Sequence, residues 1–187
     1  MFKIELVDNL AKIGLDSLYN VNIDTAKFNL LFYESYKHKE FGSVYILNQN
    51  QTEYFRLNSS QTDGYWNDFF TIGILSEKID NFLQVANEHF TSHDKIKLGI
   101  TDTALLNLVN KEPDCILEEK DLKILKYYWI DTNSLSYKAW KIPSYVASFK
   151  FKNSKLIKFG FGRYLAELDQ EFYPRNFKLS KGKLYKH

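Results

Sequence analysis

The segment Ser148–Phe159 alternates aromatic residues with lysines, and no other pattern in the chain restricts its fold as much. Successive side chains of a β-strand point to opposite faces, so the alternation predicts strands with one apolar and one cationic face. A two-residue turn at 153–154 would place rings opposite lysines, whereas a three-residue loop at 153–155 keeps the two faces separate. The pairs in that register are Phe149 with Phe159, Phe151 with Ile157, and Lys150 with Lys158. We therefore expect a hairpin with buried rings and a lysine side that is either tolerated in solvent or receives an anion.

The rest of the chain mixes helical and strand periodicity. The clearest helical pattern covers 76–90, where Ser76 can cap the helix and an apolar stripe recurs every three or four residues. We expect an α+β fold, in which helices pack on a mostly antiparallel sheet that ends in C-terminal hairpins. Further helices are expected at 101–111, 24–37 and 9–19, and strands at 2–7, 43–48, 52–57, 95–100, 127–130, 145–152 and 156–161, while 122–126 fits both periods.

Length and composition indicate an ordinary globular protein. The chain has 187 residues, of which 44% are hydrophobic and 26% are charged. No linker rich in Pro, Gly or Ser divides it, so we expect a single domain over residues 1–187. No stretch approaches the ~20 apolar residues of a membrane helix, and the first residues lack the apolar run of a signal peptide. We therefore expect a soluble, cytoplasmic protein without membrane contact.

The formal net charge of +2 conceals an uneven distribution. Residues 1–119 carry 10 basic and 18 acidic side chains, a net charge of −8, whereas residues 120–187 carry 15 and 5, a net charge of +10. The domain thus combines an acidic part, expected to be helix-rich, with a basic part, expected to be strand-rich. Such asymmetry is either neutralised within the fold or marks surfaces for partners of opposite charge.

The chain contains no complete catalytic constellation, which favours a non-enzymatic binding protein over an enzyme, and no cofactor is expected. Charge-polarised, aromatic-rich domains of this size include immunity proteins and antitoxins. The main hypothesis is therefore a protein partner, a basic toxin domain, that is neutralised by an acidic aromatic surface. The alternative for its rings, Tyr65 and Trp66, is that they anchor a loop on the core. The predicted partner-binding residues are Asp63, Tyr65, Trp66, Asp68, Glu118 and Glu119.

The alternative function is nucleic-acid binding, or a nuclease activity, through the basic C-terminal third. Lysines that follow phosphates beside rings that stack on bases are typical of proteins that bind single-stranded nucleic acid. The hairpin register separates these two sets, because it turns the rings into the core, and the chain has only 3 Arg. The predicted nucleic-acid-binding residues are Lys150, Lys152, Lys155 and Lys158.

Three weaker patterns remain. His89 and His93 have the four-residue spacing of zinc ligands on a helix, but a cation at the end of a helix explains His93 equally well, so no metal site is expected. Asp114 followed by Glu118–Lys120 imitates a nuclease signature, yet the interval is too short for two paired strands, and an acidic turn or helix start explains it better. Cys115 has acidic and apolar neighbours, which favour a buried structural thiol over a nucleophile.

Overall fold

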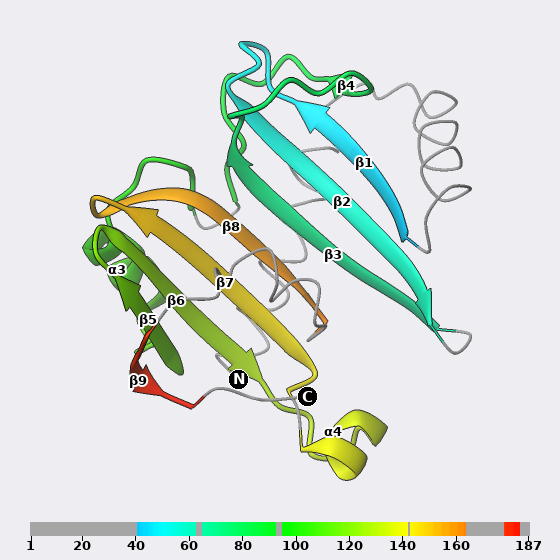
Figure 1. Ribbon diagram of the computed structural model, residues 1–187, viewed down its shortest axis with the longest axis vertical. Coiled ribbons are helices and arrows are strands. Elements are labelled where there is room, and N and C mark those ends of the chain that lie inside the picture. The colour runs from blue at the N-terminus through cyan, green and yellow to red at the C-terminus, as the bar shows by residue number, and fades with distance from the viewer. Residues whose placement is uncertain (1–40, 63–64, 93–94, 142, 164–177, 184–187) are drawn as a thin grey trace.

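The structure is a computed structural model of the chain, and it describes residues 41–62, 65–92, 95–141, 143–163 and 178–183 (Figure 1). The strands are β1 (Phe41–Leu47), β2 (Glu53–Thr62), β3 (Tyr65–Ile74), β4 (Leu83–Gln84), β5 (Cys115–Glu119), β6 (Leu122–Trp129), β7 (Tyr145–Lys152), β8 (Lys155–Arg163) and β9 (Lys178–Gly182). The helices of the described residues are α3 (Asp102–Val109) and α4 (Leu135–Trp140). Within these ranges, no helix is long and apolar enough to cross a membrane.

All of these strands belong to one sheet, in the order β4-β1-β2-β3-β8-β7-β6-β5-β9. Every neighbouring pair is antiparallel except β1 with β4, which is parallel. Two runs of consecutive strands, β1 to β3 and β5 to β8, therefore meet where β3 pairs with β8 (Figure 1). The segment 75–114 connects the two runs and contains β4 and α3.

One face of the sheet, which we call the core face, carries the main hydrophobic cluster, and the other face has buried apolar side chains of its own, among them Leu117, Ile124 and Val146. Aromatic rings of the core face meet across the strands, with ring centroids 6.0 Å apart for Phe149 and Phe159 and 6.1 Å apart for Phe70 and Phe161. The segment 75–114 covers the core face, because its apolar side chains belong to the same buried cluster. The buried members that it contributes are Leu83, Val85, Phe90, Ile96, Leu105 and Val109. Removal of this apolar area from water is the main stabilising contribution.

The predicted α+β class is wrong for the described residues, because the sheet dominates and the two helices have only 8 and 6 residues. The main error is the segment 76–90, which is not helical. Its backbone bonds to the first run of strands instead: Leu83 pairs with Ile46, and the Val85 N–H donates to the Leu47 carbonyl at 2.9 Å. Pairing with β1 thus outweighs the helical spacing of the apolar residues.

The helix predicted at 101–111 is confirmed as α3. The Thr101 hydroxyl accepts the Ala104 N–H at its start, and Asn110 ends it in the left-handed conformation. The acidic segment after Asp114, predicted as a turn or helix start, is strand β5 instead. The segment 95–100 forms only one isolated bridge, and β3 has no counterpart among the predicted strands. The elements predicted at 2–7, 9–19 and 24–37 lie outside the described residues.

The hairpin of β7 and β8 has the predicted pairing at its centre but a different turn. The central pairs are Phe149 with Phe159 and Lys150 with Lys158. The connection is a two-residue turn at 153–154, with φ of 49° and 58° at its two residues, rather than a three-residue loop. A β-bulge restores the separation of faces, because Ile157 is the extra residue and Phe151 pairs with Leu156.

Candidate functional site

The face of the sheet opposite the core carries the lysines of the hairpin. The directly opposed pairs on β7 and β8 are Lys150 with Lys158 and Lys152 with Lys155. Lys152 and Lys155 are exposed beside the turn, whereas Lys150 and Lys158 are half-buried farther along the strands. The structure therefore brings all four predicted nucleic-acid-binding residues together, and we call this set the lysine face.

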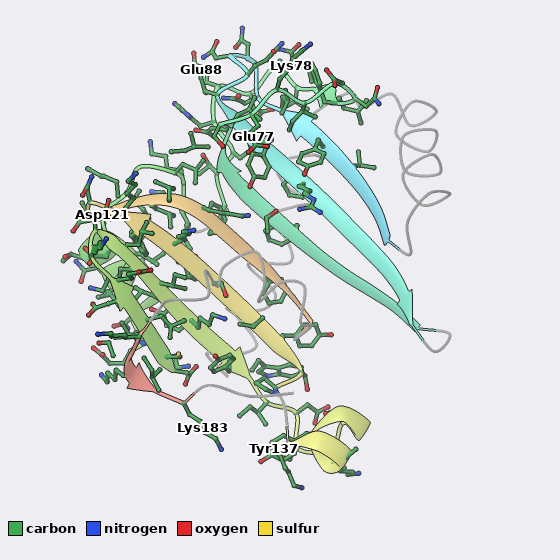
Figure 2. All side chains as sticks on the ribbon, viewed as in Figure 1. Glu77, Lys78, Glu88, Asp121, Tyr137 and Lys183 are labelled. Carbon is green, nitrogen blue, oxygen red and sulfur yellow. The ribbon has the colours of Figure 1, made fainter. Side chains whose placement is uncertain are left out.

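The positive charge of the lysine face is only partly balanced. Burial, and then the charge of Lys158, lower the pKa of Lys150 from its ordinary value. Within the described part of the chain, Lys150, Lys152 and Lys155 form no ion pair. Asp121 is exposed at this end of the sheet (Figure 2), and its carbonyl accepts a backbone N–H from the β7–β8 turn at 2.9 Å. The result is a cationic surface with an exposed carboxylate at its tip.

The aromatic rings of the same hairpin lie on the core face. Phe149, Phe151 and Phe159 are fully buried there. This confirms the predicted separation of rings from lysines, and it means that these three rings cannot stack on bases. The lysine face can therefore contact anionic groups but gains nothing from the neighbouring rings.

The residues predicted to bind a protein partner do not form one surface. Asp63 lies outside the described residues, and the backbone of Tyr65–Asp68 pairs with the last residues of β2. Glu118 and Glu119 lie on β5, and three strands, β8, β7 and β6, separate β3 from β5. Neighbouring strands are ~4.8 Å apart, so the two groups are separated by ~19 Å across the sheet.

Glu118 belongs to an ion-pair network that holds α3 on the sheet. Its Oε1 atom lies 3.7 Å from Lys123 Nζ, which also lies 3.0 Å from Asp102 Oδ2 at the start of α3. Burial alone would raise the pKa of Asp102, but the hydrogen bond and charge of Lys123 hold that pKa below its ordinary value. Among the described residues Glu119 makes no ion pair. The two glutamates therefore differ, and Glu118 already has an intramolecular partner.

The two histidines named as weak metal candidates are not placed as a helical pair. His89 lies in a non-helical segment, and His93 lies outside the described residues. His89 Nδ1 instead hydrogen-bonds with Glu53 Oε1 at 2.7 Å, and Glu53 Oε2 accepts the Phe90 N–H at 2.9 Å. Sequence reasoning missed Glu53, because no motif links residues 36 positions apart. In the part of the chain that is described, no group of three or more His, Cys, Asp or Glu could hold a metal ion.

Asp114 and Cys115 have structural surroundings. Cys115 is buried and forms no disulfide, as predicted for a structural thiol. Asp114 Oδ2 accepts hydrogen bonds from Lys111 Nζ at 2.7 Å and from the Tyr128 N–H at 2.8 Å. Asp114 therefore fixes the entry into β5.

No family model, no curated protein and no solved structure matches this chain. Function must therefore be inferred from the charge and geometry of its own residues. Of the predicted sites, the lysine face is the one that the described residues assemble in a single place.

Proposed function

We propose that the protein binds the phosphate backbone of nucleic acid through the lysine face. The main support is the register of β7 and β8, which places Lys150 opposite Lys158 and Lys152 opposite Lys155. Like charges that face each other directly across two strands destabilise the pair. Phosphates bound between them would replace this repulsion with attraction and would release condensed counterions, which is the source of sequence-independent affinity.

The residue types of the lysine face favour nucleic acid over an acidic protein. Protein interfaces are depleted in Lys and depend on buried aromatic or Arg anchors. The lysine face offers ammonium groups, while the rings beside them in the sequence, Phe149 and Phe159, are part of the core. Phosphates need only such point charges, so a polyphosphate backbone suits this surface better.

The same features define the mode of binding. None of the four positions is an Arg that could read guanine through two hydrogen bonds, and the rings of the hairpin are unavailable for stacking. We therefore expect binding without sequence preference, and binding to duplexes at least as tight as to single strands. We place this activity in the cytoplasm, as the sequence predicts, and we propose binding rather than cleavage.

Salt dependence of binding tests the proposed function directly. Fluorescence anisotropy with labelled single- and double-stranded DNA and RNA would give the association constant at several salt concentrations. If Lys150, Lys152 and Lys155 neutralise phosphates, log K falls with log salt concentration with a slope of about −2.7 for a duplex. Lys152→Gln and Lys155→Gln each reduce the size of that slope by about 0.9 and weaken binding equally for all sequences. Both side chains are exposed, so these variants should fold normally.

Two further variants serve as controls. Lys138→Gln removes an exposed lysine from α4, which lies far from the β7–β8 turn (Figure 1), and leaves the slope unchanged. Asp121→Asn removes the carboxylate at the tip of the lysine face and strengthens binding at low salt. Absence of binding at low salt, or a slope that Lys152→Gln and Lys155→Gln do not alter, would contradict the proposed function.

The main hypothesis from the sequence, an immunity protein or antitoxin that binds a basic toxin domain, stays a prediction. Its surface is divided between β3 and β5, and Glu118 is engaged with Lys123. The described residues thus offer it no single surface comparable to the lysine face.

A further inference from the structure

Strand β9 lies at the outer edge of the sheet, and β5 is its one neighbour among the described strands (Figure 1). All five residues of β9 are exposed, so β9 adds no side chain to the core. Four residue pairs join β9 to β5, and a register shift between Ile116 and Leu117 interrupts them. Elements with few buried apolar contacts open locally at a lower free energy than the rest of a fold. We therefore expect β9 to detach more readily than the strands that carry the core.

The charges at the edge of β5 favour a basic strand such as β9. Lys181 Nζ lies 3.1 Å from Glu112 Oε2, just before β5, and Lys178 pairs with Glu118 across the two strands. β9 itself contains no Asp or Glu. Opposite charges on paired strands attract, whereas like charges repel. Exposed ion pairs add little stability, but they select between partners, so an acidic strand would be disfavoured at this edge.

A glycine fixes the position of β9 on β5. Gly182 pairs with Cys115, and its φ of 92° lies in the left-handed region that favours glycine. A Cβ atom at this position would overlap the Asp114 carbonyl oxygen and would lie 2.9 Å from the Cys115 Cα atom. The two backbones are therefore too close for a larger residue. The edge of β5 accepts a strand that has glycine at this point.

The same contacts form when β9 of one copy of the chain pairs with β5 of another. They join residues 178–182 to residues 112–118, and no other described strand takes part in them. A reciprocal exchange of β9 between two copies therefore loses no strand contact, which makes exchange a low-cost route to a dimer. The strand that matches both the charge and the glycine requirement of the edge is thus β9 of a second copy.

The chain between β8 and β9 is long enough for this exchange. β8 ends at Arg163, which pairs with Tyr145 of β7, and β9 begins at Lys178, opposite Glu118 of β5. The two ends are four strand spacings and about six residues apart in the sheet, a separation of about 28 Å. Residues 164–177 can span up to about 50 Å when extended. The spare length allows β9 to reach the β5 strand of a neighbouring copy.

We propose that the edge of β5 binds β9 of a second copy of this chain, so that two copies form a strand-exchanged dimer. The dimer and the monomer contain the same β5–β9 contacts and differ in which copy supplies β9. Their ratio therefore depends on protein concentration, and the dimer forms as the concentration rises. This dimer is independent of nucleic-acid binding, because the lysine face lies on β7 and β8.

Disulfide trapping between two chains tests the exchange. Cys115→Ala removes the native thiol from both chains, one of which carries Ile116→Cys and the other Lys181→Cys with a size tag. These two residues pair across β5 and β9, and paired Cα atoms about 5 Å apart suit a disulfide. Oxidation of the concentrated mixture is expected to give a covalent heterodimer on a non-reducing gel. A single chain with both substitutions, oxidised when dilute, closes an intramolecular disulfide and so confirms the pairing itself.

Two matched chains serve as controls. Lys138→Cys puts an exposed thiol on α4 in place of Lys181→Cys and gives only collisional cross-linking. Gly182→Val, added to the Lys181→Cys chain, abolishes the heterodimer because the new Cβ atom overlaps the Asp114 carbonyl oxygen. Exchange is refuted if the Lys181→Cys mixture gives no more heterodimer than the Lys138→Cys mixture, or if the two-cysteine chain does not close.

Light scattering during size-exclusion chromatography is a second test that needs no new thiol and keeps Cys115. The dimer fraction of the unaltered protein is expected to rise with concentration, whereas Gly182→Val stays monomeric. An unaltered protein that remains monomeric at every concentration, or a dimer that Gly182→Val leaves unchanged, would contradict exchange through β9.

Discussion

The two faces of the same strands differ in how their buried side chains are stabilised. On the core face, Phe149 and Phe159 are fully buried and their rings stack. On the opposite face, the neighbouring residues along β7 are Ser148, whose buried hydroxyl makes no hydrogen bond within the described part of the chain, and the half-buried Lys150. The core face buries aromatic rings, whereas the opposite face buries apolar side chains such as Val146 and Ile124 together with polar groups that need partners. The core face of this hairpin therefore stabilises the fold, whereas the opposite face also carries the lysines on which the proposed function rests.

Phe159→Ala is the largest expected effect and tests the role of the core face. Phe159 is fully buried at the centre of β8, so its truncation removes apolar contacts and leaves a cavity that costs about 3–5 kcal/mol of the free energy of unfolding. Lys155→Ala on the same strand is the matched control, because an exposed substitution changes that free energy by about 0.5 kcal/mol or less. Urea unfolding of both variants measures the contrast. Similar losses from the two variants would refute the division between the faces.

The sequence predicts this contrast between the faces within one hairpin, because the alternation of Phe149 and Lys150 is local. It does not predict the bulge at Ile157, since only the pairing with β7 shows which residue is extra. The helix prediction for 76–90 is wrong for a similar reason. The partner of this segment is β1, and the pairing of Leu83 with Ile46 joins positions that no local pattern connects. Local periodicity therefore identifies faces, and long-range pairing decides the elements.

The candidate sites show the same limit. All four residues of the lysine face lie within one hairpin, so the sequence identifies them together. The pairing of Thr71 in β3 with Gly160 in β8, by contrast, joins two runs of strands that no local pattern connects. The contact of Glu53 with His89 was missed for the same reason.

Asn48→Ala gives an intermediate effect, because Asn48 is a buried polar residue whose bonds are complete. Its Oδ1 accepts the N–H groups of Thr52 and Glu53 at 2.8 and 2.9 Å, and its Nδ2 donates to Thr52 Oγ1 at 3.0 Å and to the Glu88 carbonyl at 2.6 Å. Loss of these bonds costs about 2–3 kcal/mol of the free energy of unfolding. The exposed neighbour Gln49→Ala is the control, with little change expected by the same measurement.

If Asn48→Ala lowered the free energy of unfolding only slightly, the expected difference between buried polar groups with and without hydrogen bonds would be refuted. Hydrogen-bonded polar groups would then contribute no more to stability than the hydroxyls of Thr71 and Ser148, which make no hydrogen bond among the described residues and whose removal is expected to leave stability unchanged or higher. The comparison of the two kinds of variant therefore separates buried polar groups that stabilise the fold from those that do not.

Lys150→Met gives the smallest effect and concerns the opposite face alone. Burial, and then Lys158, lower the pKa of Lys150 in the folded protein, so the unfolded chain binds this proton more tightly. The charge of Lys150 therefore destabilises the folded protein at neutral pH. The free energy of unfolding rises as the pH increases from the pKa of Lys150 in the folded protein towards its ordinary value of 10.5. Lys150→Met removes the repulsion, which raises the free energy of unfolding at neutral pH by about 0.2–1 kcal/mol and removes this part of the alkaline rise.

Urea unfolding of both proteins over the alkaline range isolates Lys150 as the difference between the two curves, with the exposed Lys152→Met as control. If Lys150→Met lowered the free energy of unfolding at neutral pH, the charge of Lys150 would not be destabilising and this prediction would be wrong. The same variant should also bind duplex nucleic acid more weakly, because it lacks one phosphate contact of the lysine face. A substitution that stabilises the fold while weakening binding is the expected behaviour of a residue retained for a ligand rather than for the fold.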